Sequence, residues 1–66
     1  MSRGSHHDET GLLNDVRGQL ILRRDDGGTW RLDAPTSAHM LAGKRVRVVG
    51  VRADFDLLDV KLVEAI

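Results

Sequence analysis

The sequence has no cysteine, one proline and only two aromatic residues, Trp30 and Phe55, in 66 positions. Without cysteine, disulfide bonds and thiolate zinc sites are excluded. No apolar run is long enough to span a bilayer, and the segment MSRGSHHDET lacks the hydrophobic stretch of a secretory signal. We therefore expect one small, soluble, cytoplasmic domain without a membrane partner.

An excess of charge of one sign is also missing. Ten lysine and arginine residues balance ten aspartate and glutamate residues, so the formal net charge is zero. Proteins that bind nucleic acid without sequence preference are usually basic, because neutralising phosphates supplies most of that affinity. A neutral chain can do the same only where its arginines gather on one face.

Local patterns divide the chain into a tail and a β domain. Residues 1–9 are polar and charged, so we expect a disordered tail, followed by a single domain over 10–66. Alternating apolar and polar residues then predict strands, and Asp-Gly-Gly at 26–28 predicts a hairpin, because its loop needs residues that tolerate positive φ. The predicted strands cover 11–18, 19–24, 29–33, 44–52 and 56–65, and a helical turn covers 37–42.

The same alternation predicts which side chains form the core. Gly50 predicts a bulge or bend, because the apolar phase slips after it. Phe55 is expected to plug one end of the barrel, and Gly43 to follow the end of the helical turn. Expected to point inward are Leu12, Leu13, Val16, Leu20, Leu22, Trp30, Leu32, Ala38, Met40, Leu41, Val46, Val48, Leu58, Val60 and Leu62.

Five short strands with one helical turn between the third and fourth predict an all-β fold, a five-stranded Greek-key barrel of the OB type. An SH3-like barrel is the main rival, since it also has five short strands. Its short helix usually falls in the last turn between strands, whereas here the helical turn comes one connection earlier. The position of that turn favours the OB-like layout.

Several motifs also carry a family resemblance. They are Gly-x-Leu at 11–13, GQLILRRDDGGTWRLD at 18–33, LAGKRVRVVGVR at 41–52 and FDLLDVKLV at 55–63. Together they resemble a family of short uncharacterised bacterial proteins classed as a domain of unknown function, over residues 10–64. The resemblance implies a minimal OB-type barrel, and it implies no catalytic or binding residues.

Four arginines and the single tryptophan are the candidate binding residues. Arg23, Arg31, Arg45 and Arg47 fall on the outward face of their predicted strands, where they could form one phosphate-binding patch. Trp30 lies on the third strand, from which OB-folds stack bases. The competing interpretation places Trp30 in the core beside Leu32. It treats the arginines as a solvated face paired with acids such as Asp15, Asp33 and Asp59.

No catalytic constellation is visible, so we expect a protein that is not an enzyme and that uses no cofactor or metal. His39 lacks a serine or cysteine partner, and the Gly-rich turn joins two strands instead of preceding a helix. Two hypotheses remain, a module for single-stranded nucleic acid and a module for protein interaction or self-assembly, as monomer or weak homodimer. The second is based on outward apolar residues, namely Ile21, Val49, Val51, Leu57 and Val63.

Overall fold

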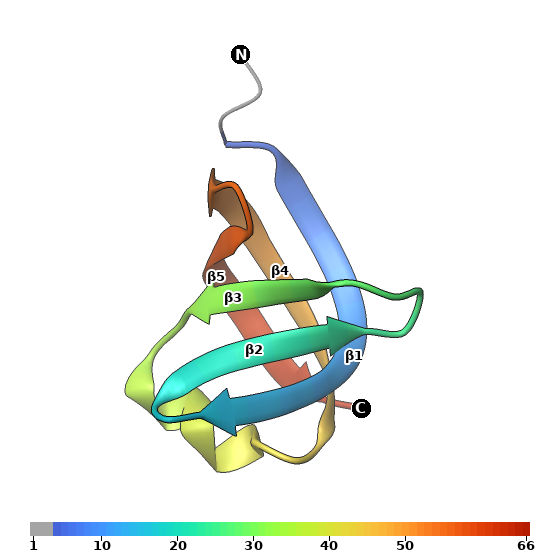
Figure 1. Cartoon of the computed structure of the whole chain (residues 1–66), viewed down its shortest axis with the longest axis vertical. Helices are drawn as coiled ribbons and strands as arrows, with labels where there is room; N and C mark the ends of the chain where they lie inside the picture. The colour runs from blue at the N-terminus through green and yellow to red at the C-terminus, as the bar shows by residue number, and fades with distance from the viewer. Residues whose placement is uncertain (1–3) are drawn as a thin grey trace.

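The computed structural model describes residues 4–66 and shows a small barrel of five strands (Figure 1). One short 3-10 helix lies between the third and fourth strands, as predicted. The elements are β1 (His6–Val16), β2 (Gln19–Arg24), β3 (Thr29–Asp33), η1 (Thr36–Leu41), β4 (Arg45–Asp54) and β5 (Leu57–Ala65).

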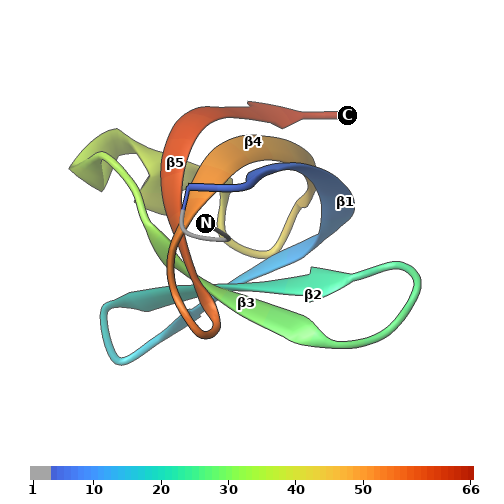
Figure 2. The same cartoon turned by 90° about the horizontal axis from the view of Figure 1, so that it is seen from above.

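The strands close into a ring in the order β1-β2-β3-β5-β4, which is seen from above in Figure 2. All neighbours are antiparallel except β3 and β5, which are parallel. The long strand β1 closes the ring because it pairs twice. Residues 11–16 pair with β2, and residues 6–12 pair with β4. The predicted closed all-β barrel is therefore confirmed.

The β2–β3 hairpin forms as its sequence predicts. Gly27 and Gly28 have φ angles of 97° and 82°, in the left-handed region that side chains with a Cβ avoid. The backbone N–H of Arg24 donates to the carbonyl of Gly28 over 3.0 Å and closes the turn. This tight turn fixes the register in which Leu22 lies opposite Trp30, so both side chains enter the barrel.

The core consists of ten side chains that follow the predicted alternation closely. Four predicted members are instead exposed: Val16 at the end of β1 beside the turn, Met40 on η1, Leu12 of β1 and Leu62 of β5. No helix among residues 4–66 combines the length and the hydrophobicity that crossing a bilayer requires. The buried residues are Leu13, Leu20, Leu22, Trp30, Leu32, Ala38, Val46, Val48, Leu58 and Val60.

A bulge in β5 corrects the predicted phase of that strand. Val49 lies opposite Leu62, but the next residue of β4, Gly50, lies opposite Val60, so Lys61 is an extra residue. The insertion reverses the alternation beyond it. Leu62, which the sequence placed inside, is 41% exposed, and Val63 packs against the core in its place. The irregularity predicted at Gly50 is confirmed.

The predicted tail is also corrected. His6 to Glu9 do not form a tail, because they are the first residues of β1 and pair with residues 48–51 of β4. Their polar composition misled the sequence interpretation, since a strand paired along one edge gains stability from backbone hydrogen bonds that need no apolar side chain. The rest of the predicted tail includes residues 1–3, which lie outside the described part of the chain.

Candidate binding site at the mouth of the barrel

Arg47 is the most strongly paired of the predicted binding residues. Its guanidinium donates to both carboxylate oxygens of Asp8, over 3.0 and 2.7 Å, and to Glu64 over 3.3 Å. The hydrogen bonds from Arg47 lower the pKa of Asp8, and those carboxylates in turn raise the pKa of Arg47. With two acids already bound, Arg47 has little free charge to offer a phosphate.

Arg31 and Arg45 are paired in the same way. Arg31 donates from Nη2 and Nε to Asp56, over 2.7 and 2.9 Å, and lowers the pKa of that carboxyl. Arg45 forms an ion pair with Asp25, whose pKa is also lowered. The competing sequence interpretation is right that outward arginines pair with acids, but it names the wrong ones. Three of the four predicted arginines are therefore neutralised locally.

The four arginines also do not converge on one groove. Leu12 of β1 lies opposite both Arg23 of β2 and Arg45 of β4, so these two arginines flank it. Arg31 lies on β3, opposite Ile21, on the other side of β2. The curvature of the ring therefore spreads their charges around the outside. Arg23 is exposed, and no carboxylate of residues 4–66 forms an ion pair with it.

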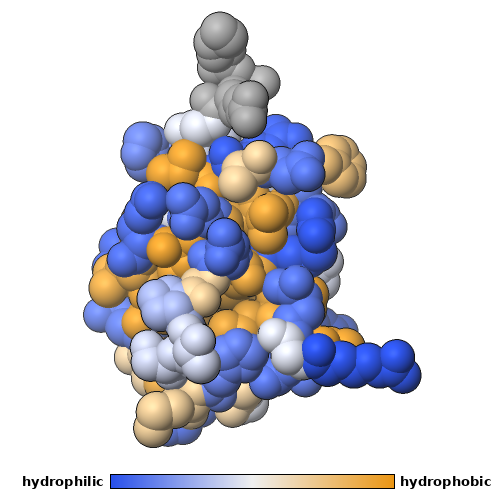
Figure 3. All heavy atoms as spheres, turned by 90° about the vertical axis from the view of Figure 1, so that its left-hand side faces the viewer, coloured by the Kyte–Doolittle hydropathy of each residue, from blue (hydrophilic) through white to orange (hydrophobic). Residues whose placement is uncertain are grey.

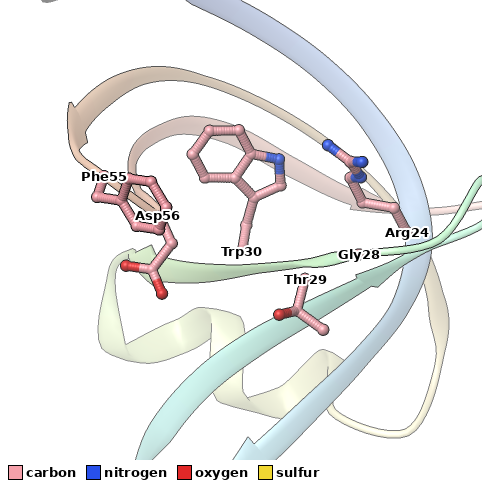
Figure 4. A pocket seen from close by; sticks show the side chains of 6 residues that line it. All are labelled: Arg24, Gly28, Thr29, Trp30, Phe55 and Asp56. Carbon is pink, nitrogen blue, oxygen red and sulfur yellow. The ribbon is translucent and has the colours of Figure 1, made fainter.

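A shallow pocket of about 220 Å³ lies at the end of the barrel where β1 begins (Figure 4). It forms there because the pairing is incomplete. Residues 6–10 of β1 pair only with β4, and β3 pairs with β5 only from Arg31 onward. The start of β3 therefore faces an opening. The lining residues are Arg24 at the end of β2, Gly28 in the β2–β3 turn, Thr29 and Trp30 at the start of β3, and Phe55 and Asp56 in the β4–β5 turn.

Trp30 forms the middle of this pocket. Trp30 is 7% exposed, which confirms the prediction that it belongs to the core. With so little exposed surface, it can offer a ligand only an edge of its ring. The ring of His7 packs against it with centroids 4.8 Å apart and a 56° tilt. The indole Nε1 is buried and has no hydrogen-bond partner among residues 4–66. Buried donors without an acceptor are rare in native proteins.

Phe55 overturns another prediction, because it does not plug the barrel. It lies in the turn between β4 and β5 and is 81% exposed, while the backbone N–H of Phe55 donates to Asp54 over 2.7 Å. The guanidinium carbon of Arg52 lies 6.0 Å from the centre of the phenyl ring. A turn this tight turns its aromatic side chain outward, so Phe55 presents a ring to solvent beside the pocket.

Polar side chains close the other end of the pocket. Arg24 donates from Nε to the carbonyl of Gly27 over 2.9 Å, and its Nη1 lies 4.0 Å from Glu9. His7 Nδ1 lies 3.6 Å from the same carboxylate. Sequence reasoning missed His7, Arg24 and Phe55 as site residues. The available signal was Phe55 itself, an aromatic residue between two aspartates in a short connection.

The described part of the chain shows no metal centre: nowhere in residues 4–66 do three histidine or acidic side chains group closely enough to hold an ion. The pocket instead brings together the rings of Trp30 and Phe55, the Arg24 guanidinium at one edge, the Arg52 guanidinium beside Phe55, and a buried indole N–H without a partner among residues 4–66. Such a set can stack on a flat group and donate hydrogen bonds to it. It contains no paired nucleophile and base.

Comparisons with known proteins identify the family and nothing more specific. No curated protein and no solved structure matches this chain. A family model described as "Protein of unknown function (DUF5818)" matches residues 10–66, which is most of the chain and agrees with the resemblance seen in the sequence. The chain therefore belongs to this family of unknown function.

Proposed function

We propose that this protein is a non-catalytic binding module of the OB type that takes single-stranded nucleic acid at the mouth of the barrel. The observation that carries the proposal is Phe55, an aromatic ring 81% exposed beside a pocket on β3. OB-type barrels bind oligonucleotides with strands two and three and with the loop between strands four and five. The pocket is lined from those same elements.

The size and lining of the pocket support a flat ligand group. At about 220 Å³ it is smaller than the roughly 300–1,000 Å³ clefts that enclose drug-sized ligands. It can therefore receive one base and not a whole nucleotide. Stacking on an aromatic side chain contributes about 1–3 kcal/mol per base and tolerates every sequence, because each base has a π face.

The charges support binding led by stacking and not by phosphate contacts. Arg23 and Arg52 are the cations of β2 and β4 for which no ion pair is found within residues 4–66, and Arg52 lies next to Phe55. Because only one or two phosphates would be neutralised, the salt dependence is shallow, with a slope of about −0.7 per phosphate for single strands. This weak dependence reconciles nucleic-acid binding with a net charge of zero.

The proposal can be tested by an amide NMR titration of the full chain with a mixed-sequence, single-stranded DNA of 15 nucleotides at low salt. We expect shifts at Phe55, Trp30 and Arg24. The Phe55→Ala variant should bind roughly 5-fold to 150-fold more weakly, which is the factor that corresponds to one lost stacking contact. Met40→Ala is the matched control, since Met40 is also 81% exposed but lies on η1 at the opposite end (Figure 1).

The outcomes separate clearly. Weaker binding by Phe55→Ala, with Met40→Ala unchanged, supports the site. An unshifted spectrum of the wild-type protein rules out the proposed ligand. Shifts that cluster instead at Arg45 and Arg47 would show that the outer arginines bind despite their ion pairs, as the sequence first suggested.

A protein-interaction module is the second candidate, and one observation favours it. Large apolar side chains are exposed on the outside of the barrel, with Leu12 40% and Leu62 41% exposed. Figure 3 shows hydrophobic residues lying between hydrophilic ones on one side of the molecule. Of the outward residues predicted from the sequence, Val63 packs inward, and Ile21, Val49, Val51 and Leu57 are half-buried. A mass that rises with concentration above 7.3 kDa would support self-association.

A further inference from the structure

The indole N–H of Trp30 has no role in holding the fold together. Trp30 belongs to the core cluster, but its Nε1 lies buried without an acceptor among residues 4–66. Tryptophan is a donor only, and a buried tryptophan usually finds a partner for its N–H. Leaving this donor unpaired lowers stability, so its retention in a core position calls for an explanation.

The position of the nitrogen points to the pocket. Figure 4 shows Phe55 and Asp56 at one end, Arg24 and Gly28 at the other, and the indole nitrogen on the side of its ring that faces Arg24. That end of the pocket carries two donors, the indole N–H and the Arg24 guanidinium. The nearby carbonyls of Gly27 and Gly28 already accept hydrogen bonds from Arg24. The carboxylates of Glu9 and Asp26 lie 4.0 and 3.1 Å from the Arg24 guanidinium, so the indole N–H is the donor at this end for which a ligand has to supply the acceptor.

We infer that Trp30 Nε1 recognises an exocyclic carbonyl oxygen of a base, one nucleotide away from the base that stacks on Phe55. This inference rests on the proposed function and adds to it a preference for thymine over adenine. A phosphate is a poor candidate for this acceptor, because it would have to give up its water beside an aromatic wall. Thymine carries carbonyl oxygens, whereas each base-pairing acceptor of adenine lies beside its amino donor.

Access to the nitrogen requires a side chain to move. Nε1 is covered in the free protein: Arg24 lies on the nitrogen side of the indole at the pocket wall, and the ring of His7 packs against the indole. Arg24 is held by the carbonyl of Gly27 over 2.9 Å and by Asp26 over 3.1 Å, and a hydrogen bond of 2.9 Å joins His7 Nε2 to Ser5 Oγ; all of these contacts lie at the surface. Uncovering the donor therefore requires one of these side chains to leave its partners and adopt another rotamer.

The test compares oligothymidylate and oligodeoxyadenylate of 15 nucleotides by fluorescence anisotropy of labelled DNA. For the wild type we expect tighter binding of the thymidylate. Trp30→Phe keeps a ring and removes the donor, so it should weaken thymidylate binding roughly 5-fold, the factor for a net hydrogen bond of about 1 kcal/mol. Its adenylate binding should not change. Phe55→Leu is the control, because it should weaken both and leave their ratio intact.

A second measurement needs no variant. Trp30 is the only tryptophan, so the indole N–H gives one NMR signal, which should move downfield on addition of oligothymidylate and stay in place with oligodeoxyadenylate. This signal decides the case if Trp30→Phe does not fold. Equal losses for both oligonucleotides in Trp30→Phe, or an unmoved indole signal while Phe55 shifts, would overturn the inference and leave the proposed function standing. Failure of the wild type to bind either oligonucleotide would overturn both.

Discussion

Closure of the barrel depends on Gly11, because β1 approaches the backbone of β2 closely at this residue, and we expect Gly11→Ala to destabilise the protein. Gly11 pairs with Arg24 of β2 and with Val46 of β4, at the point where β1 passes from one neighbour to the other. A methyl group at Gly11 would collide with the carbonyl oxygen of Arg23. It would also lie 2.7 Å from the carbonyl carbon of Arg23 and 2.9 Å from the Cα of Arg24.

These contacts set the size of the effect. Ordinary contact begins at 3.4 Å, and the colliding atoms belong to the backbone of β2, so rotating a side chain cannot relieve them. The strands must separate, which costs about 1–3 kcal/mol for overpacking and about 1 kcal/mol for a weakened backbone hydrogen bond. The bond nearest the collision joins Asp25 N–H to the carbonyl of Thr10 over 3.0 Å. We therefore expect Gly11→Ala to lose about 3 kcal/mol.

That loss is large for so small a domain, whose total free energy of unfolding is expected to be about 3–10 kcal/mol. Thermal unfolding followed by circular dichroism should show a Tm lower by roughly 12–24 °C. Gly18→Ala is the control, because its methyl group meets nothing within 4 Å and only its φ of 85° is unfavourable, at about 1–2 kcal/mol. If Gly11→Ala melts no lower than Gly18→Ala, the close approach of β1 to β2 at Gly11 does not limit the stability of the protein, and the reasoning is refuted.

Three further predictions concern the bulge, the acids and the arginines. Leu58→Ala should lower the free energy of unfolding by about 2–5 kcal/mol, because Leu58 is buried. Leu62→Ala on the same strand should lower it by less than about 1 kcal/mol, because Leu62 is 41% exposed. Equal losses in urea unfolding would contradict the reversal of phase at the bulge. The lowered pKa values of Asp8, Asp15, Asp25 and Asp56 mean that these carboxylates stabilise the fold above their ordinary pKa of 3.8. The free energy of unfolding should therefore fall as the pH drops below about 4, and Asp8→Asn should make that fall less steep. If the acid titrations of the variant and the wild type superimpose, Asp8 does not contribute to it. Arg52→Gln should weaken DNA binding and make the dependence of log K on log salt concentration shallower by about 0.7. Arg47→Gln should leave the affinity and its salt dependence unchanged, because the charge of Arg47 is already paired. The reverse ranking of the two variants would place the site on the outer arginines.

The fold could be predicted from the sequence because its signals are local. Strict alternation placed Leu13, Leu22 and Val48 in the core, and all three are fully buried. Asp-Gly-Gly specified the β2–β3 turn, and Gly43, with a φ of 86°, ends the helical turn as expected. Each of these signals acts within a few residues of chain, where backbone sterics and burial on one face leave few alternatives.

The site could not be predicted in the same way, because its residues come from three separate parts of the chain. The acids that neutralise Arg31, Arg45 and Arg47 lie between 17 and 39 residues away in the sequence, so no local pattern pairs them. The strand that begins at His6 has a polar sequence and forms only because β4 offers it an edge.

The sequence by itself determined the strands, their turns, most of the core and the absence of a thiol, because composition, alternation and turn chemistry are properties of short segments. Only the tertiary structure decided which charges are neutralised, and that Phe55 faces solvent. Only closure of the ring buried the indole N–H of Trp30 without an acceptor beside a pocket. Those outcomes depend on distances between residues far apart along the chain, and such distances exist only once β1 has joined β2 to β4.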